Sequence, residues 1–90
     1  MKRLPVELGS IVISKAGRDQ GRLFLVVAEV DDDFVMVANG ALRKMDRQKK
    51  KRRKHLKPTG AKVEAVAQRL AEGRSIEDHE VRTWLSEEEE

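Results

Sequence analysis

The first half of the chain alternates short apolar runs with polar interruptions, which is the pattern of short β-strands joined by turns. β-Branched residues fill positions 11–13, and longer apolar runs cover positions 23–30 and 34–38. Three aspartates at 31–33 separate the two longer runs, and Asn39-Gly40 follows as a dipeptide suited to positive φ. These runs predict a meander of antiparallel strands.

Two further short strands are predicted near residues 41–45 and 55–57, and the basic segment 47–54 is interpreted as the loop between them. Together the five strands would form a curled sheet. Five short strands with tight turns are typical of a small barrel. We therefore expect a mainly β fold in the first two thirds of the chain.

After Pro58 the spacing of the apolar residues changes to three and four, which predicts a helix that Gly73 is placed to end. The apolar face of this helix contains Val63, Val66, Ala67 and Leu70. A second helix is expected from Ser75, which forms a variant capping box with Asp78. Its apolar residues are Val81, Trp84 and Leu85. Two such short helices are marginal alone, so their apolar stripe must pack on itself, on the sheet or on a partner.

Charge divides the chain into a basic part and an acidic part. The 90 residues carry a formal net charge of +3, from 19 Lys and Arg against 16 Asp and Glu. Residues 1–58 hold 15 basic and 7 acidic side chains, whereas residues 59–90 hold 4 basic and 9 acidic ones. Ten of the fifteen residues at 43–57 are basic. Electrostatics should therefore dominate whatever the protein binds.

Most catalytic and cofactor chemistries lack the residues they require. Cysteine is absent, which excludes disulfide frameworks, thiolate zinc sites and thiol nucleophiles. His55 and His79 are the only histidines, and no local motif places a nucleophile beside either. Gly17 and Gly21 do not match a phosphate-binding P-loop, and the aspartates at 31–33 lack the spacing of a calcium loop. We expect no enzyme activity, cofactor, metal or small-molecule substrate.

A membrane segment is not expected either. The longest purely apolar run, at 23–28, has six residues, far short of the ~20 needed for a spanning helix. Met1-Lys2-Arg3 has the charge of a signal peptide, but Pro5, Glu7 and Gly9 interrupt the apolar run that should follow. We therefore expect a soluble, cytoplasmic protein.

Six adjacent cations, Lys49-Lys50-Lys51-Arg52-Arg53-Lys54, form the densest part of the basic segment. Their mutual repulsion weakens a compact state unless a polyanion neutralises them. A solvated loop or a localisation signal is the alternative interpretation. Among polyanions, RNA or DNA is favoured over a membrane surface, because the run has no aromatic or leucine anchor face.

The chain has few aromatic residues with which to read bases. Phe24 and Phe34 lie inside strand patterns and Trp84 lies in a helical stripe, so each is interpreted as a core residue and not as a base-stacking platform. What remains is phosphate contact by Lys and Arg, which gives affinity and shape preference with little base specificity.

The segment from Gly9 to Val30 resembles the KOW motif, in which apolar strands flank a loop whose glycine, here Gly21, precedes the second strand. The match continues through residues 34–40, the basic residues 43–54 and the closing Lys54-His55-Leu56-Lys57-Pro58-Thr59. This order of segments resembles the fourteen-e type of archaeal and eukaryotic large-subunit ribosomal protein and its small bacterial relatives. The likeness covers residues 8–59 and leaves the helical stretch 61–85 outside it.

The resemblance implies an SH3-like five-stranded barrel that binds RNA without enzyme activity, with ribosomal RNA as the expected partner and ribosomal proteins as further candidates. It divides the chain into a barrel at 1–59 with a basic arm at 43–57, a helical extension at 60–86 and an acidic tail at 87–90. The RNA-binding residues expected on this basis are Lys15, Arg18, Arg22, Arg43, Lys44, Arg47, Lys49, Lys50, Lys51, Arg52, Arg53 and Lys54. Gly17, Gly21 and Gly40 are expected either to permit turn geometry or to let the backbone approach RNA closely.

A second hypothesis is a protein-interaction adaptor of transcription or ribosome assembly. In that case the barrel edge or the helical stripe contacts a protein, and the basic arm only tunes the association. Crosslinking in cells separates the two hypotheses, because only the first requires RNA on the barrel and arm.

Overall fold

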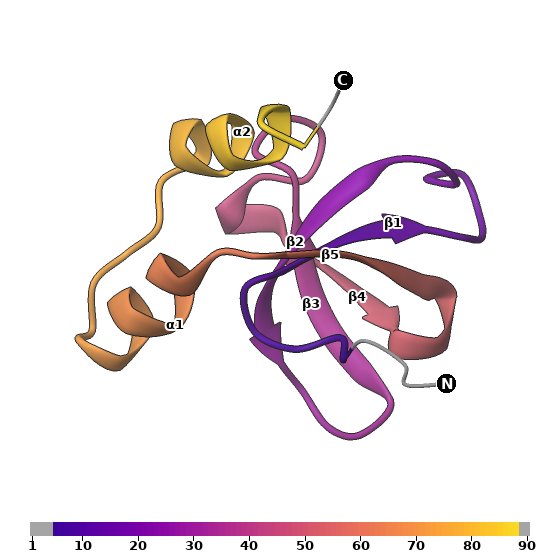
Figure 1. Ribbon diagram of the computed structural model, residues 1–90, viewed down its shortest axis with the longest axis horizontal. Helices are drawn as coiled ribbons and strands as arrows, with labels where there is room; N and C mark the ends of the chain where they lie inside the picture. Colours follow the sequence, from indigo (N-terminus) through magenta and orange to yellow (C-terminus); the bar gives the residue numbers. More distant parts are fainter. Residues whose placement is uncertain (1–4, 89–90) are drawn as a thin grey trace.

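The computed structural model describes residues 5–88, which form a curled antiparallel sheet with two helices packed on one side (Figure 1). The elements in chain order are β1 (Ser10–Ser14), β2 (Leu23–Glu29), β3 (Phe34–Ala38), the 3₁₀ helix η1 (Met45–Arg47), β4 (Lys49–Arg52), the 3₁₀ helix η2 (Arg53–His55), β5 (Leu56–Lys62), α1 (Glu64–Ala71) and α2 (Asp78–Ser86). The strand order is β4-β3-β2-β1-β5, and each neighbouring pair is antiparallel. The prediction of a mainly β fold followed by two helices is confirmed.

Closure of the sheet into a barrel is not confirmed. β4 and β5 are the edge strands, and η2 joins them in the sequence without a ladder between them in the described part of the chain. The sheet nevertheless curls strongly (Figure 1). Irregular registers accompany this curl, between Val26 and Ala28 in β2 and between Ser10 and Val12 in β1. Such irregularities bend a strand and increase its twist.

The fourth strand lies further along the chain than the sequence pattern indicated, whereas the fifth begins where it was predicted, near 55–57, and continues to Lys62. Residues 41–44 form a turn and bend segment, whereas Lys49–Arg52 of the basic run forms β4. Lysine is a poor strand former, but pairing with β3 places Lys49 opposite Val37 and Lys51 opposite Val35. The prediction of a strand at 41–45 and a loop at 47–54 was therefore wrong, because this tertiary pairing outweighs the local preference.

Two apolar clusters lie on opposite faces of the sheet, because successive residues of a strand point to opposite sides. The concave face contains Val12, Phe24, Val26, Val35, Val37 and Leu56. The other face joins sheet and helices through Ile11, Leu25, Val27, Ala38, Val66, Ile76, Val81 and Leu85. The helical stripe therefore packs on the sheet, which was one of the three options that the sequence left open.

The helix boundaries agree with the sequence at one end only. Gly73 ends α1 with a φ of 71°, and the Arg74 N–H donates to the carbonyl of Arg69 at 2.8 Å. α2 begins at Asp78 with Glu77 as its N-cap, and not at Ser75. The predicted start of this helix was wrong. Ile76 is buried in the core between sheet and helices, and this keeps residues 74–77 out of the helix. No helix in residues 5–88 has the length and apolar character to span a membrane.

Candidate nucleic-acid interface

β4 divides the basic run between the two faces of the sheet. Lys49 and Lys51 lie opposite the buried residues Val37 and Val35, so they share the concave face. The alternate residues of β4 stand on the other face and are exposed. The run is therefore a strand edge that carries two sets of cations, and these sets have different surroundings.

The first set is held by Asp19, which lies in the β1–β2 turn. The Oδ2 atom of Asp19 is 3.0 Å from Lys49 Nζ and 3.4 Å from Lys51 Nζ. Lys51 also donates to Ser14 Oγ at 3.2 Å, and only 10% of its side chain is exposed. The hydrogen bond from Lys49 is the main reason that the pKa of Asp19 lies below its usual value. These two lysines connect the turn to the edge strand.

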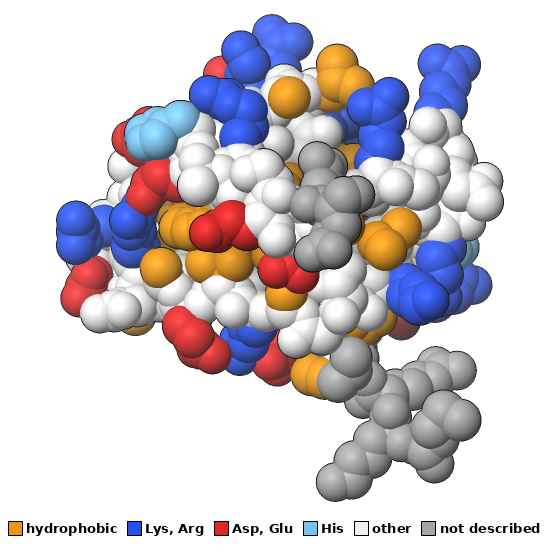
Figure 2. Space-filling model, turned by 45° about the horizontal axis from the view of Figure 1, so that its top comes forward, with side chains coloured by type: hydrophobic (Ala, Val, Ile, Leu, Met, Phe, Trp, Pro, Cys, Tyr) orange, Lys and Arg blue, Asp and Glu red, His pale blue; other side chains and the backbone are white. Residues whose placement is uncertain are grey.

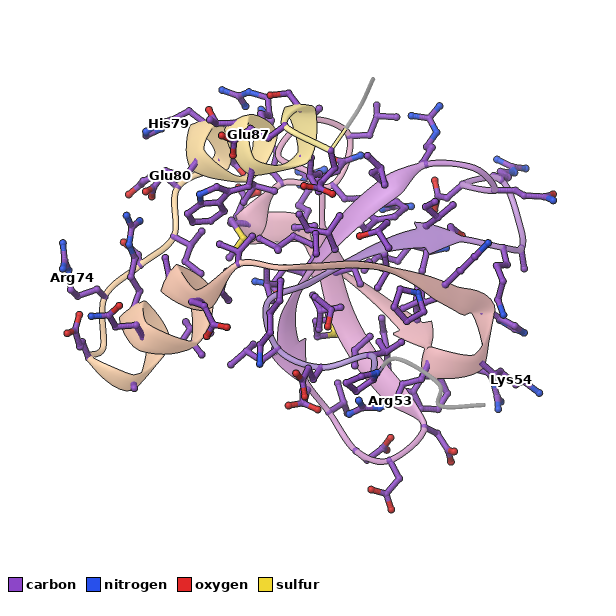
Figure 3. All side chains as sticks on the ribbon, viewed as in Figure 1. Arg53, Lys54, Arg74, His79, Glu80 and Glu87 are labelled. Atoms are coloured by element: carbon purple, nitrogen blue, oxygen red, sulfur yellow. The ribbon has the colours of Figure 1, made fainter. Side chains whose placement is uncertain are left out.

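Arg53 is also engaged inside the molecule. Its guanidinium donates to the carbonyl of Asp31 at 2.9 Å, to the carbonyl of Val6, and to the Glu29 carboxylate at 2.8 Å. In Figure 3 the Arg53 side chain lies against the fold, whereas that of the neighbouring Lys54 projects outward. An RNA contact by Lys49, Lys51 or Arg53 stays a prediction, and each would have to share or leave its internal partners.

The other cations of the run, Lys50, Arg52 and Lys54, are exposed. Within residues 5–88 no carboxylate lies within 4 Å of their charged groups. The remaining predicted RNA-binding residues also have no carboxylate within 4 Å among the described residues, and all but the half-buried Arg43 are exposed. They are Lys15, Arg18, Arg22, Arg43, Lys44 and Arg47. Nine of the twelve predicted residues thus present their charge without a described carboxylate partner.

One hollow brings cations from four segments together. It is lined by Lys15, Arg52, Arg53, Lys54 and Lys57, with Asp32 and Asp33 as acidic members. The Lys15 N–H donates to the carbonyl of His55 at 2.8 Å, which keeps the end of β1 beside η2. Lys57 belongs to the predicted arm but not to the named RNA-binding residues. Its place in the basic segment was the signal that could have identified it.

The structure does not gather all predicted residues at that hollow. Arg22 lines a separate hollow beside the end of α2, together with Arg82 and Asn39. Residues 43–47 lie near the start of α2, because the Met45 N–H donates to the Asp78 carboxylate at 2.7 Å. The cations therefore form a central group around β4 and η2 and a second group toward α2.

The three glycines named from the sequence all have positive φ. Gly17 and Gly21 have φ values of 75° and 87°, and an added Cβ would meet nothing within 4 Å at either. Turn geometry is thus sufficient to explain them. Gly40 is different, because a Cβ there would lie 2.5 Å from the carbonyl oxygen of Asp78. Its absent side chain lets α2 pack closely on the segment after β3.

Phe34 is the aromatic residue that the sequence pattern misplaced. Phe24 is fully buried and Trp84 packs against the core shared with the helices, as predicted. Phe34 is only half-buried and belongs to neither described core cluster. The Nζ of Lys50 lies 4.6 Å from its ring centroid, and the guanidinium carbon of Arg52 lies 4.9 Å from it. The alternation that buries Val35 and Val37 was the signal that Phe34 faces outward.

The helical part presents a different surface. Arg74, His79, Glu80 and Glu87 lie on this side, away from Lys54 (Figure 3). In Figure 2 acidic and apolar side chains mix on the left and lower parts of the visible face, and Lys and Arg side chains lie at the left edge, along the top and at the right edge. Glu80 pairs with Arg69, which lowers the pKa of Glu80. Of the predicted acidic tail, Glu87 and Glu88 are exposed, and residues 89–90 lie outside the described residues.

Comparison with known proteins shows similarity to a ribosomal protein. No family model matches the chain. Over 58 residues the chain is 34% identical to the large ribosomal subunit protein eL14 of Desulfurococcus amylolyticus. The match covers 64% of this chain and 60% of that protein, so the chain spans about three fifths of the length of this curated relative. The resemblance to ribosomal proteins of the fourteen-e type, which the order of sequence motifs indicated, is thereby confirmed.

Proposed function

We propose that this protein is a non-enzymatic RNA-binding protein of the cytoplasmic ribosome, which contacts ribosomal RNA through its phosphates. The observation that carries the proposal is the basic hollow formed by Lys15, which directly follows β1, and by residues from β4, η2 and β5. The similarity to a large-subunit ribosomal protein supports RNA as the polyanion. The curled sheet would be an SH3-like barrel that is open between its edge strands β4 and β5.

The exposed cations supply the affinity in this proposal. Lys50, Arg52 and Lys54 can reach phosphate oxygens without giving up a described carboxylate partner. Arg52 can bind two oxygens of one phosphate through its planar guanidinium, whereas the lysines act as mobile point charges. Lys49 and Lys51 would instead position the β1–β2 turn, so that Lys15 and Arg18 face the same RNA.

The division of the chain follows from this assignment. Residues 1–59 would form the RNA-binding unit, with 43–57 as its basic segment. The helical extension at 60–86 and the acidic tail at 87–90 would face away from RNA, and ribosomal proteins are the candidate partners there. Repulsion between phosphates and the acidic helical part would favour this orientation.

Ultraviolet crosslinking in cells, followed by identification of both RNA and peptide, tests the proposal. We expect ribosomal RNA crosslinked to peptides that contain Lys15, Lys54 and Lys57. A profile of protein crosslinks that persists after ribonuclease treatment, with no RNA on these peptides, would contradict the proposal and favour the adaptor hypothesis.

A further inference from the structure

We propose that Phe34, together with Lys50 and Arg52, forms a stacking platform for an unpaired base of RNA. This inference rests on the proposed function and extends it by naming the class of RNA that is bound. That class is single-stranded RNA, or an unpaired base in a loop or bulge. Nothing in the phosphate-contact assignment requires a half-buried aromatic ring at this position.

Strand pairing places the three side chains on one surface. Phe34 lies directly opposite Arg52 across the β3–β4 ladder, and Lys50 lies two residues away on the same face of β4. Both cations are exposed, and the Phe34 ring is half-buried. Their charged groups lie within 5 Å of the ring centroid. Apolar and cationic groups are therefore combined in one small area at the edge of the sheet.

This combination fits the chemistry of an unpaired nucleotide. A base stacks on an aromatic face whatever its identity, because every base has a π face. An arginine guanidinium can extend the stack, since its plane also packs on bases. Lys50 and Arg52 can neutralise the phosphates on either side of a base bound at Phe34. Bases of a continuous double helix are already stacked on both sides, so the platform should discriminate against duplex RNA.

The same residues also have a structural interpretation. Lysines on an edge strand discourage pairing with a second chain, and a cation over a ring contributes modestly to stability at an exposed site. Lys50 alone would satisfy the first role. Phe34 lies outside both described core clusters, so burial does not account for an aromatic side chain there. RNA affinity distinguishes the two interpretations, because the structural one leaves it unchanged.

The test compares Phe34→Leu with the matched control Val30→Ala. Val30 is an exposed apolar residue on the other side of the turn 31–33 that joins β2 to β3. The probes are single-stranded oligouridine and a blunt RNA duplex with the same number of phosphates. We expect Phe34→Leu to lower affinity for oligouridine about 5-fold to 150-fold, from the range for aromatic–base stacking, and to leave duplex affinity unchanged. Phe34→Trp should keep wild-type affinity for both probes, and so should Val30→Ala.

Equal affinity of Phe34→Leu and wild type for oligouridine would overturn the platform and leave phosphate binding intact. An equal loss on both probes would also overturn the platform, because the substitution would then act on RNA binding in general and not on an unpaired base. A wild-type protein that binds neither probe would overturn the proposed function itself. If Phe34→Leu does not fold, crosslinking of the wild-type protein to oligouridine decides the question. An adduct on Phe34 supports the platform, and adducts confined to other residues contradict it.

Discussion

Replacing Asp19 with asparagine should destabilise the fold, because two lysines converge on this carboxylate. The side chains of Asp19 and Lys51 are 13% and 10% exposed, whereas that of Lys49 is 35% exposed. Removing one partner of a fully buried pair costs about 3–5 kcal/mol, and exposed pairs contribute at most about 1 kcal/mol. Because Asp19→Asn keeps one carbonyl acceptor, we expect an intermediate loss of about 1–3 kcal/mol. In a domain of this size the melting temperature should fall on the order of 10 °C.

The pH dependence of this loss provides a second measurement. The folded-state pKa of Asp19 lies below the usual value of 3.8, chiefly because of the Lys49 hydrogen bond. The ion pairs therefore contribute fully above pH 3.8, and their contribution decreases as the pH falls through the folded-state pKa. The difference in melting temperature between wild type and Asp19→Asn should be full at neutral pH and should shrink in acid.

Thermal unfolding followed by circular dichroism measures both effects, with Asp46→Asn as the control. Asp46 is exposed in η1 and has no ion pair among the described residues, so its replacement changes net charge by the same amount without removing a contact. If Asp19→Asn melts at the temperature of Asp46→Asn from neutral to acid pH, Asp19 does not hold the turn against β4.

Two other predictions concern the packing of the helices. Gly40→Ala should lower the urea midpoint of unfolding more than Gly17→Ala does. Both variants place alanine at positive φ, but only at residue 40 does the new Cβ meet α2. Equal midpoints would refute the close packing of α2 on Gly40. Arg69→Gln should reduce the free energy of unfolding by about 1 kcal/mol, because it removes the pair with Glu80 that links α1 to α2. Glu80→Gln should produce a loss of similar size in chemical denaturation, and additive losses in the double variant would show that the two side chains do not interact.

Local sequence patterns predict those parts of the structure that local physics determines. The apolar runs at 11–13, 23–30 and 34–38 mark β1, β2 and β3 because most of their side chains are buried, on one face of the sheet or the other. The aspartates at 31–33 make the expected turn, in which Asp31 Oδ1 accepts hydrogen bonds from the N–H groups of Asp33 at 2.9 Å and Phe34 at 2.8 Å. These hydrogen bonds also lower the pKa of Asp31.

Features that depend on distant partners could not be predicted in this way. β4 exists because the basic run pairs with β3, and charge alone suggested a loop. Asp19 and Lys49 are 30 positions apart, so no sequence window contains both. The surroundings of the predicted RNA-binding cations could not be predicted for the same reason. Six consecutive cations are equivalent in the sequence, but the alternation of a strand gives Lys49 and Lys51 internal partners and leaves Lys50 and Arg52 exposed.

The salt dependence of RNA affinity in two matched triple variants tests the central claim most directly. One variant carries Lys50→Gln, Arg52→Gln and Lys54→Gln, and the other carries Lys49→Gln, Lys51→Gln and Arg53→Gln. Both remove three cations from the same six residues, so their net charges are equal. The first should lose only the modest stability of its exposed contacts with Phe34. It should make the log–log slope shallower by about 2–3, from 0.7–0.9 per lost phosphate contact. The second should chiefly lower the melting temperature and, at temperatures where it is folded, keep a slope close to that of wild type. If the two variants have equal salt slopes and equal melting temperatures, the separation of exposed RNA-binding cations from internally paired ones is contradicted.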